Sequence, residues 1–162
     1  MLTTLLCPGP SLAVRKPVGD TFIAVNRAAL IAERAHRIAS NWWVFGDGGP
    51  WINIADQLIC RPQIFAAGKA MIDIANAGRA DELRGYPPYR EWESAYADWP
   101  PMFGWTEFSA CAGLVACVLA GATEVNVYGA DWTCVDADAD GVALHTNTRT
   151  PSRWHDEAIH WA

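Results

Sequence analysis

The sequence lacks the patterns that define several common functional classes. It contains neither GxGxxG nor GxxxxGK[ST], which disfavours an ordinary dinucleotide-binding domain and a Walker-type ATPase. No apolar run reaches the roughly 18 residues of a membrane span. Basic residues number 12 against 18 acidic ones, and the formal charge of −6 argues against general nucleic-acid binding. We therefore expect no membrane and no nucleic-acid partner, and we favour a small-molecule ligand.

Cysteines are few, and no two of them form a CxxC pair. There are five, an odd number, and two lie in one apolar helical stretch, so we expect reduced and mostly buried thiols. The start, MLTTLLCPGP, has no basic region and is broken early by prolines, unlike a signal peptide. These features predict a cytosolic protein.

The chain has the composition of one packed domain. At 162 residues and 51% apolar residues, it can bury a substantial core within a single globular unit. The stretch 106–131, TEFSACAGLVACVLAGATEVNVYGAD, predicts a helix capped by Thr106 or Ser109, a turn at Gly121, a short strand containing Val125 and Val127, and a polar end. Helix followed by strand is typical of an α/β sheet.

Four further strands are predicted before this block. The apolar runs, each followed by a turn or polar segment, are Leu2–Leu6, Thr21–Val25, Asn41–Phe45 and Gln63–Ala66. Helices are predicted over Ala28–Ile38 and Ile52–Leu58. Parallel strands joined by helices predict an α/β, three-layer Rossmann-like fold with a mostly parallel sheet.

Two segments are harder to assign to this fold. Residues 79–105 are rich in proline, tyrosine and tryptophan and predict either a lid or a long surface loop. Residues 132–162 are predicted to form a polar tail with a helix beginning at Pro151. Nine tryptophans are distributed along the chain, and we expect most to fill the core and its rim, with a stacking platform for a flat ligand as the alternative.

Four polar residues follow predicted strands at their carboxyl ends: Ser11, Asn26, Asp47 and Asp131. Ligands of open parallel sheets bind beyond these ends, so together they predict a pocket. Each has a simpler alternative: a stiff turn for the CPGPSL loop around Ser11, a turn former for Asn26, and a local amide contact for Asp47. In the CPGPSL loop, backbone amides and the Ser11 hydroxyl are candidate phosphate donors.

The polar tail holds less specific candidates. Residues 136–141, DADADG, match the first half of a calcium loop, but Asn147 stands where the bidentate glutamate belongs, which favours a solvated acidic turn. His145, His155 and His160 are possible general bases, and their spacing identifies none of them. Arg149 and Arg153 can meet phosphate oxygens or pair with nearby acidic residues.

Three quoted stretches together resemble a known superfamily: CPGPSL, IAVNRA and SACAGLVACVLAGATEVNVYGAD. The chain resembles the Rossmann-like bacterial sialyltransferases that use a CMP-activated sugar, and the domains similar to 6-hydroxymethylpterin diphosphokinase. YGADWT, DADG and RW-x-x-E in the tail also look like small phage-encoded proteins. The resemblance covers the sheet core, about two thirds of the chain, and the sialyltransferases carry a larger lid and more chain beyond the sheet.

The resemblance implies a nucleotide-facing pocket. Gly9, Pro10 and Ser11 would border the phosphates, Asn26 would contact the nucleotide or sugar, and Asp47, Gly129 and Asp131 would lie around it. The base of the sialyltransferases is a histidine in a later segment, for which His155 is the nearest candidate, so His155 and Asp131 are the predicted catalytic residues. No resident metal is predicted.

The leading hypothesis is therefore a nucleotide-sugar-dependent glycosyltransferase-like protein. The first alternative is phosphoryl or pyrophosphoryl transfer, in which Asp47 and Asp131 place magnesium. The second is a non-catalytic module that binds a nucleotide. A homo-oligomer in which two chains complete one site is compatible with each hypothesis.

Overall fold

A computed structural model describes residues 1–96 and 109–131 of the chain. Six strands form one sheet in the order β5-β4-β3-β2-β1-β6, and every neighbouring pair is parallel. This confirms the predicted α/β architecture, which is consistent with a three-layer Rossmann-like fold. The strands are β1 (Leu2–Leu6), β2 (Thr21–Val25), β3 (Trp42–Phe45), β4 (Gln63–Ala66), β5 (Arg90–Glu91) and β6 (Glu124–Tyr128).

The central strands form where aliphatic, aromatic and threonine residues follow one another. β1 is buried from Thr3 to Leu6, because helices cover both faces of an all-parallel sheet. β3 begins at Trp42, one residue later than predicted, and the side-chain oxygen of Asn41 accepts the N–H of Phe22 at 2.8 Å. The strand predictions are confirmed for β1, β2, β3, β4 and β6.

The connecting helices are short. They are α1 (Ser11–Val14), α2 (Ala28–Ile31), α3 (Gly49–Ile54), α4 (Gly68–Asn76), α5 (Trp92–Tyr96) and α6 (Ser109–Leu119), with a short π-helix η1 (Ala32–His36) and two 3₁₀ helices, η2 (Ala55–Gln57) and η3 (Ala80–Gly85). The predicted helix at 28–38 is α2 followed by the π-helical turn η1. It stops because Arg37 adopts a left-handed φ of 57°.

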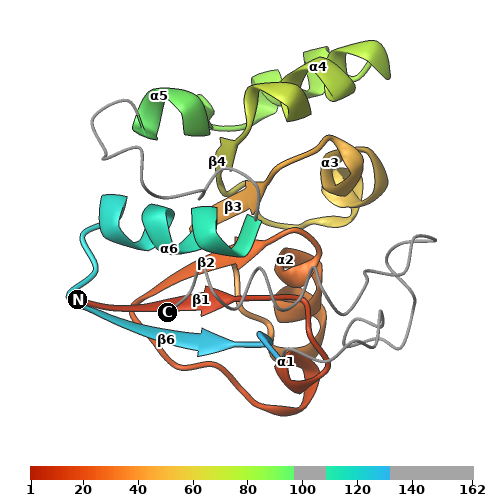
Figure 1. Ribbon diagram of the computed structural model, residues 1–162. Helices are drawn as coiled ribbons and strands as arrows, with labels where there is room; N and C mark the ends of the chain where they lie inside the picture. The colour runs from red at the N-terminus through yellow and green to blue at the C-terminus, as the bar shows by residue number, and fades with distance from the viewer. Residues whose placement is uncertain (97–108, 132–162) are drawn as a thin grey trace.

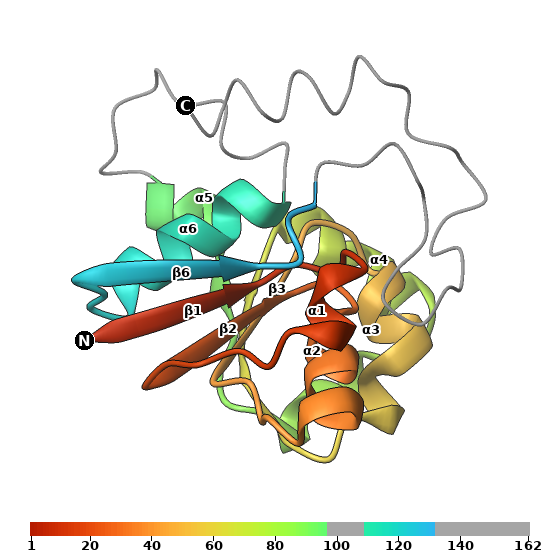
Figure 2. The same ribbon diagram turned by 90° about the horizontal axis from the view of Figure 1, so that it is seen from below.

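The helices lie in two layers, one on each face of the sheet. Figure 1 and Figure 2 show α5 and α6 on one face and α1 to α4 on the other. The α6 layer approaches the sheet closely because its residues are small: a side chain at Gly113 would collide with Leu5 of β1 and contact Val25 of β2. On the opposite face, Trp43, Phe45 and Trp51 pack among aliphatic side chains.

Tryptophan fills the core as predicted in the part of the chain that the structure covers. Trp43, Trp51 and Trp92 are fully or almost fully buried, whereas Trp42 is partly exposed. The rings of Trp43 and Trp51 stack with their centroids 5.8 Å apart, and Tyr86 meets Trp51 edge-on at 4.7 Å. The remaining tryptophans, at 99, 105, 132, 154 and 161, lie outside the described residues.

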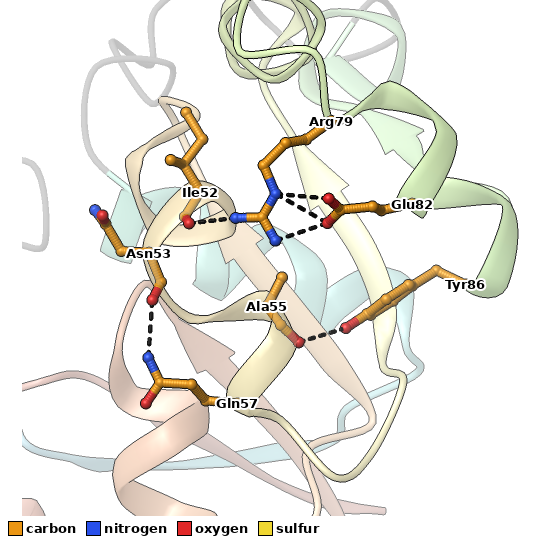
Figure 3. A network of polar contacts seen from close by, with 7 residues as sticks. All are labelled: Ile52, Asn53, Ala55, Gln57, Arg79, Glu82 and Tyr86. Atoms are coloured by element: carbon orange, nitrogen blue, oxygen red, sulfur yellow. Dashed lines mark hydrogen bonds and ion pairs between the residues drawn. The ribbon is translucent and has the colours of Figure 1, made fainter.

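Polar side chains tie α3 to the segment after α4 (Figure 3). Arg79 donates to the carbonyl oxygen of Ile52 in α3 and to the carboxylate of Glu82, with Arg79 Nη2 2.7 Å from Glu82 Oε2. Hydrogen bonding to Glu82 raises the pKa of Arg79, and the same contact lowers the pKa of Glu82. The hydroxyl of Tyr86 donates to the carbonyl oxygen of Ala55 at 3.2 Å. Side-chain hydrogen bonds therefore join α3 and η2 to the segment after α4.

The segment predicted as a lid or surface loop is partly built into the sheet. Residues 79–96 contain η3, β5 and α5, and β5 pairs with β4 through Phe65 opposite Arg90 and Ala66 opposite Glu91. Trp92 anchors this stretch beneath α6, 1% exposed. Residues 97–105 of the same prediction lie outside the described ranges.

Two further predictions concern thiols and membranes. Among the cysteines of residues 1–96 and 109–131, Cys7, Cys111 and Cys117 are buried and Cys60 is half-buried, as predicted for mostly buried thiols. Burial raises the pKa of the Cys117 thiol to about 12. None of the helices in these ranges has the length and apolarity that crossing a bilayer requires.

Candidate functional site

The sheet has one topological switch point, between β1 and β6. From β1 the chain proceeds strand by strand to β5 at one edge, and it then returns to place β6 on the other side of β1. The direction in which successive strands are added is therefore reversed between β1 and β6. Open α/β sheets bind ligands at such a point. We call residues 7–11 and 129–131 the switch-point junction.

Backbone hydrogen bonds join the two loops of the junction. The N–H of Cys7 donates to the carbonyl oxygen of Tyr128 and the N–H of Gly9 to that of Gly129, each at 2.8 Å. Asp131 adds a side-chain contact, because its Oδ2 accepts the N–H of Ser11 at 2.8 Å. The structure thus brings Gly9, Ser11, Gly129 and Asp131 together, although they are far apart in sequence.

Glycine is required at two places in the junction. Gly129 has a left-handed φ of 76°, and a side chain there would collide with the carbonyl oxygen of Cys7. A side chain at Gly9 would collide with the carbonyl oxygen of Gly129 and with the Asp131 carboxylate. Both glycines permit the close approach of β1 and β6, which is a structural reason for their presence.

The backbone amides predicted as phosphate donors are already used. Pro8 and Pro10 have no N–H group. The other N–H groups from residue 7 to residue 13 donate within the fold, at Cys7, Gly9, Ser11, Leu12 and Ala13. The amide cradle predicted for the CPGPSL loop is therefore not present in this conformation, and the Ser11 hydroxyl is the donor that the loop retains.

Asn26 lies after β2, next to the junction. Its φ of 51° is left-handed, which favours asparagine, and its backbone is fixed by donation to the carbonyl oxygen of Val44 at 2.8 Å and acceptance from Trp43 Nε1 at 2.7 Å. The turn-forming role considered for Asn26 is thus observed. Its half-buried side-chain amide makes no hydrogen bond to the described residues, so a ligand role remains compatible with the same geometry.

Asp47 lies two strands from the junction and is exposed. Its Oδ1 accepts the N–H of Gly49 at 2.8 Å, which is the local amide contact considered for it. β2 and β1 separate β3 from β6, so the ends that carry Asp47 and Asp131 are about 14 Å apart at roughly 4.8 Å per strand spacing. Two carboxylates that share one magnesium ion each lie about 2.1 Å from it. The fold does not bring Asp47 and Asp131 together in this way.

Carboxylates also organise the loops after β3 and β4, and the sequence did not single these residues out. Asp73 accepts the N–H of Gly48 at 3.1 Å and lies 2.7 Å from the ammonium of Lys69. Hydrogen bonding to Lys69, with help from Gly48, lowers the pKa of Asp73. Glu93 accepts the N–H of Gly68, the first residue of α4, with both oxygens at 3.1 and 3.3 Å. The Lys69–Asp73 pair has the i,i+4 spacing of a helical ion pair, whereas Asp73 and Glu93 each reach an N–H group 25 residues away, which no local pattern predicts.

Histidine is absent from the carboxyl edge within the described ranges. The histidine that they contain, His36, contacts the carbonyl oxygen of Leu12 and ties η1 to α1. The predicted base His155 lies outside those ranges, as do His145, His160, Arg149, Arg153 and the acidic turn at 136–141. Residues 1–96 and 109–131 hold no cluster of three His, Cys, Asp or Glu side chains suited to a metal.

Comparisons with protein-family models, with curated proteins and with solved structures found no match to this chain. The argument for function therefore rests on the sequence and the fold.

Proposed function

We propose that this chain is a nucleotide-sugar-dependent glycosyltransferase-like protein that binds its nucleotide at the carboxyl edge of the sheet. The observation that carries the proposal is the switch point between β1 and β6, where Ser11 and Asp131 lie in contact. Asn26 follows the adjacent strand β2, so its amide extends the same edge by one strand. The ligand is a small molecule, and no resident metal is part of the proposal.

The polar groups at this edge suit a ligand rich in hydroxyl groups. A carboxylate accepts hydrogen bonds, a hydroxyl both donates and accepts, and an amide does both at separate atoms. Asp131, Ser11 and Asn26 supply these three groups on neighbouring strand ends.

In the proposed reaction an acceptor hydroxyl attacks the anomeric carbon of the bound sugar. The new carbon–oxygen bond forms as the bond from that carbon to the phosphate oxygen breaks, and the nucleotide leaves with the electron pair. A general base receives the proton of the acceptor hydroxyl. Under the resemblance to the sialyltransferases, His155 is the nearest candidate for this role.

The first test is thermal unfolding with CMP, UDP, GDP, ATP and the sugar conjugates of the first three, each with and without magnesium. A ligand that binds only the folded state raises the midpoint, by the equivalent of about 2.7 kcal/mol at one hundred times its dissociation constant. We expect a selective, magnesium-independent rise with one pyrimidine nucleotide and its sugar conjugate. A rise with ATP that requires magnesium favours phosphoryl transfer instead, and no rise with any of them contradicts the proposal.

The Asn26 side chain offers a sharper test, because one substitution can remove its amide and keep its backbone conformation. Glycine tolerates the left-handed φ of 51°, so Asn26→Gly should keep the unfolding midpoint within a few degrees while removing the amide. If the amide contacts the nucleotide, we expect roughly tenfold weaker binding by calorimetry. Unchanged binding by Asn26→Gly would leave Asn26 as a turn residue only.

Turnover separates the enzyme from a binding module. With the nucleotide-sugar selected above, release of free nucleotide in the presence of a sugar acceptor should be abolished or strongly reduced in His155→Ala, while binding persists. Binding by the unmodified chain without any product would support the non-catalytic alternative. Full transfer activity in His155→Ala would exclude His155 as the base.

A further inference from the structure

The hydrogen bonds of the switch-point junction define which part of a nucleotide it can receive. A phosphate site built from a loop needs N–H groups that point at the ligand. Here the N–H groups of Cys7, Gly9 and Ser11 donate to β6 and to Asp131. Pro8 and Pro10 interrupt the loop at the positions between them. The junction therefore offers a phosphate no backbone donor over these residues.

The charge of the junction also disfavours a phosphate. The Asp131 carboxylate already occupies the position that an anion would take at the N–H of Ser11, 2.8 Å away. A side chain at Gly9 would collide with this carboxylate, so the loop and the carboxylate are packed directly against each other. A phosphate brought to the same place would meet a like charge, which repels it.

The groups that remain at the junction match hydroxyls. Asp131 is half-buried, and its Oδ1 accepts no hydrogen bond from residues 1–96 or 109–131, while the Ser11 hydroxyl is likewise without a partner in those ranges. The carboxylate oxygen can accept a hydrogen bond from one ligand hydroxyl. The serine hydroxyl beside it can donate to, or accept from, a second ligand hydroxyl.

We infer that the switch-point junction binds the ribose hydroxyls of the nucleotide, through Asp131 and Ser11, and that the phosphate lies elsewhere on the carboxyl edge. The inference rests on the proposed function. It places the ribose at this loop, where the sequence predicted the phosphates. Asp131 is then a specificity-determining residue that selects ribose over deoxyribose.

The test compares ligands and variants in one cycle, measured by titration calorimetry. The ligands are CMP with its 2′-deoxy and 3′-deoxy forms, and UMP with the same two forms. For the nucleotide that binds, we expect loss of at least one hydroxyl to weaken binding to the unmodified chain by roughly tenfold, the usual cost of a hydrogen bond to a charged group. This arm needs no variant, so a folding defect cannot obscure it.

The variant arm uses Asp131→Asn, which removes the charge but keeps an oxygen that can accept the Ser11 N–H. We expect it to weaken binding of the ribonucleotide and to bind the deoxy form almost as well as the ribonucleotide. Glu124→Gln is the matched control, because it removes one exposed carboxylate from the opposite end of the same strand, β6. It should leave both affinities and the dependence on hydroxyls unchanged.

The outcomes separate this inference from the proposed function. Tighter binding of the ribonucleotide by Asp131→Asn would show that the carboxylate faces the phosphate, and would overturn the inference while leaving nucleotide binding intact. Equal affinity of the unmodified chain for the ribonucleotide and both deoxy forms would overturn it as well. If neither CMP nor UMP binds, and the thermal unfolding panel shows no other nucleotide that binds, the proposed function fails and the inference fails with it.

Discussion

The two halves of the carboxyl edge are held together by different kinds of contact. At the switch-point junction, backbone meets backbone, with glycine at the points of closest approach and Asp131 as the added side chain. In the half formed by β3, β4 and β5, carboxylates of Asp73 and Glu93 reach the loop amides, and Arg79 ties the helices behind them. Close backbone contacts at glycines hold the first half together, and charged side chains hold the second half together. An added side chain at Gly9 or Gly129 should therefore disturb the first half, and changes of charge or pH at Asp73, Glu93 or Arg79 should disturb the second.

The largest expected effect is at Gly129. Gly129→Ala combines a left-handed φ with a collision against the carbonyl oxygen of Cys7, and we expect it to lower the free energy of unfolding by about 3 kcal/mol or more. Gly121→Ala is the matched control, because Gly121 has a similar φ of 83° and nothing within 4 Å of an added side chain. It should cost about 1 kcal/mol. Equal losses in urea unfolding would show that the close approach of β1 and β6 contributes nothing.

A smaller effect is expected at Arg79, in the half held by charge. Arg79→Ala removes the contacts with Glu82 and Ile52 from a side chain that is 21% exposed, and should cost about 1 kcal/mol in urea unfolding. Arg79→Lys keeps the charge but not the planar fork, so we expect it to restore only part of the loss.

Arg84→Ala is the control for this prediction. Its partner is Asp81, three residues away, and both side chains are more than 80% exposed, at 83% and 85%. Exposed pairs of this kind stabilise little, so the variant should be close to neutral. A loss as large as that of Arg79→Ala would mean that net charge, and not the contact with α3, is what stabilises this half.

The smallest effect concerns pH. The pKa of Asp73 is lowered in the folded state by Lys69 and Gly48, so its contribution to stability is present above the unfolded pKa of about 4 and is lost as pH falls through the lower folded value. We expect the difference in unfolding midpoint between the unmodified chain and Asp73→Asn to be small at pH 7 and to vanish in acid. A difference that is independent of pH would show that the carboxylate charge is unimportant.

Much of the fold follows from local sequence, and the reasons are visible in particular elements. β1, β2 and β4 were predicted to the residue because they are apolar runs between turn-forming or polar residues, the pattern of a strand buried on both faces. β5 escaped prediction because it has two residues, Arg90 and Glu91, both polar, and it exists through pairing with β4. Strand pairing of this kind is a tertiary effect that local pattern does not encode.

The candidate site, like the fold, was only partly predictable from local sequence. The positions of Ser11, Asn26 and Asp131 after their strands could be predicted, since strand ends are local features. The hydrogen bond from the Ser11 N–H to Asp131 could not, because it depends on β6 lying beside β1. For the same reason, the sequence could not predict that N–H groups of this loop donate to the end of β6. These hydrogen bonds are why we propose a ribose site where the sequence predicted a phosphate site.

The order of the strands also bears on how the protein is made. β2, β3, β4 and β5 each pair with the strand that precedes them in the chain, so a growing polypeptide can add them in turn as it leaves the ribosome. β6 instead pairs with β1, and the contact between Ser11 and Asp131 spans 120 residues. A nascent chain that ends before residue 124 can form most of the sheet but none of the contacts between β1 and β6, so the proposed ligand site can form only after β6 has been made.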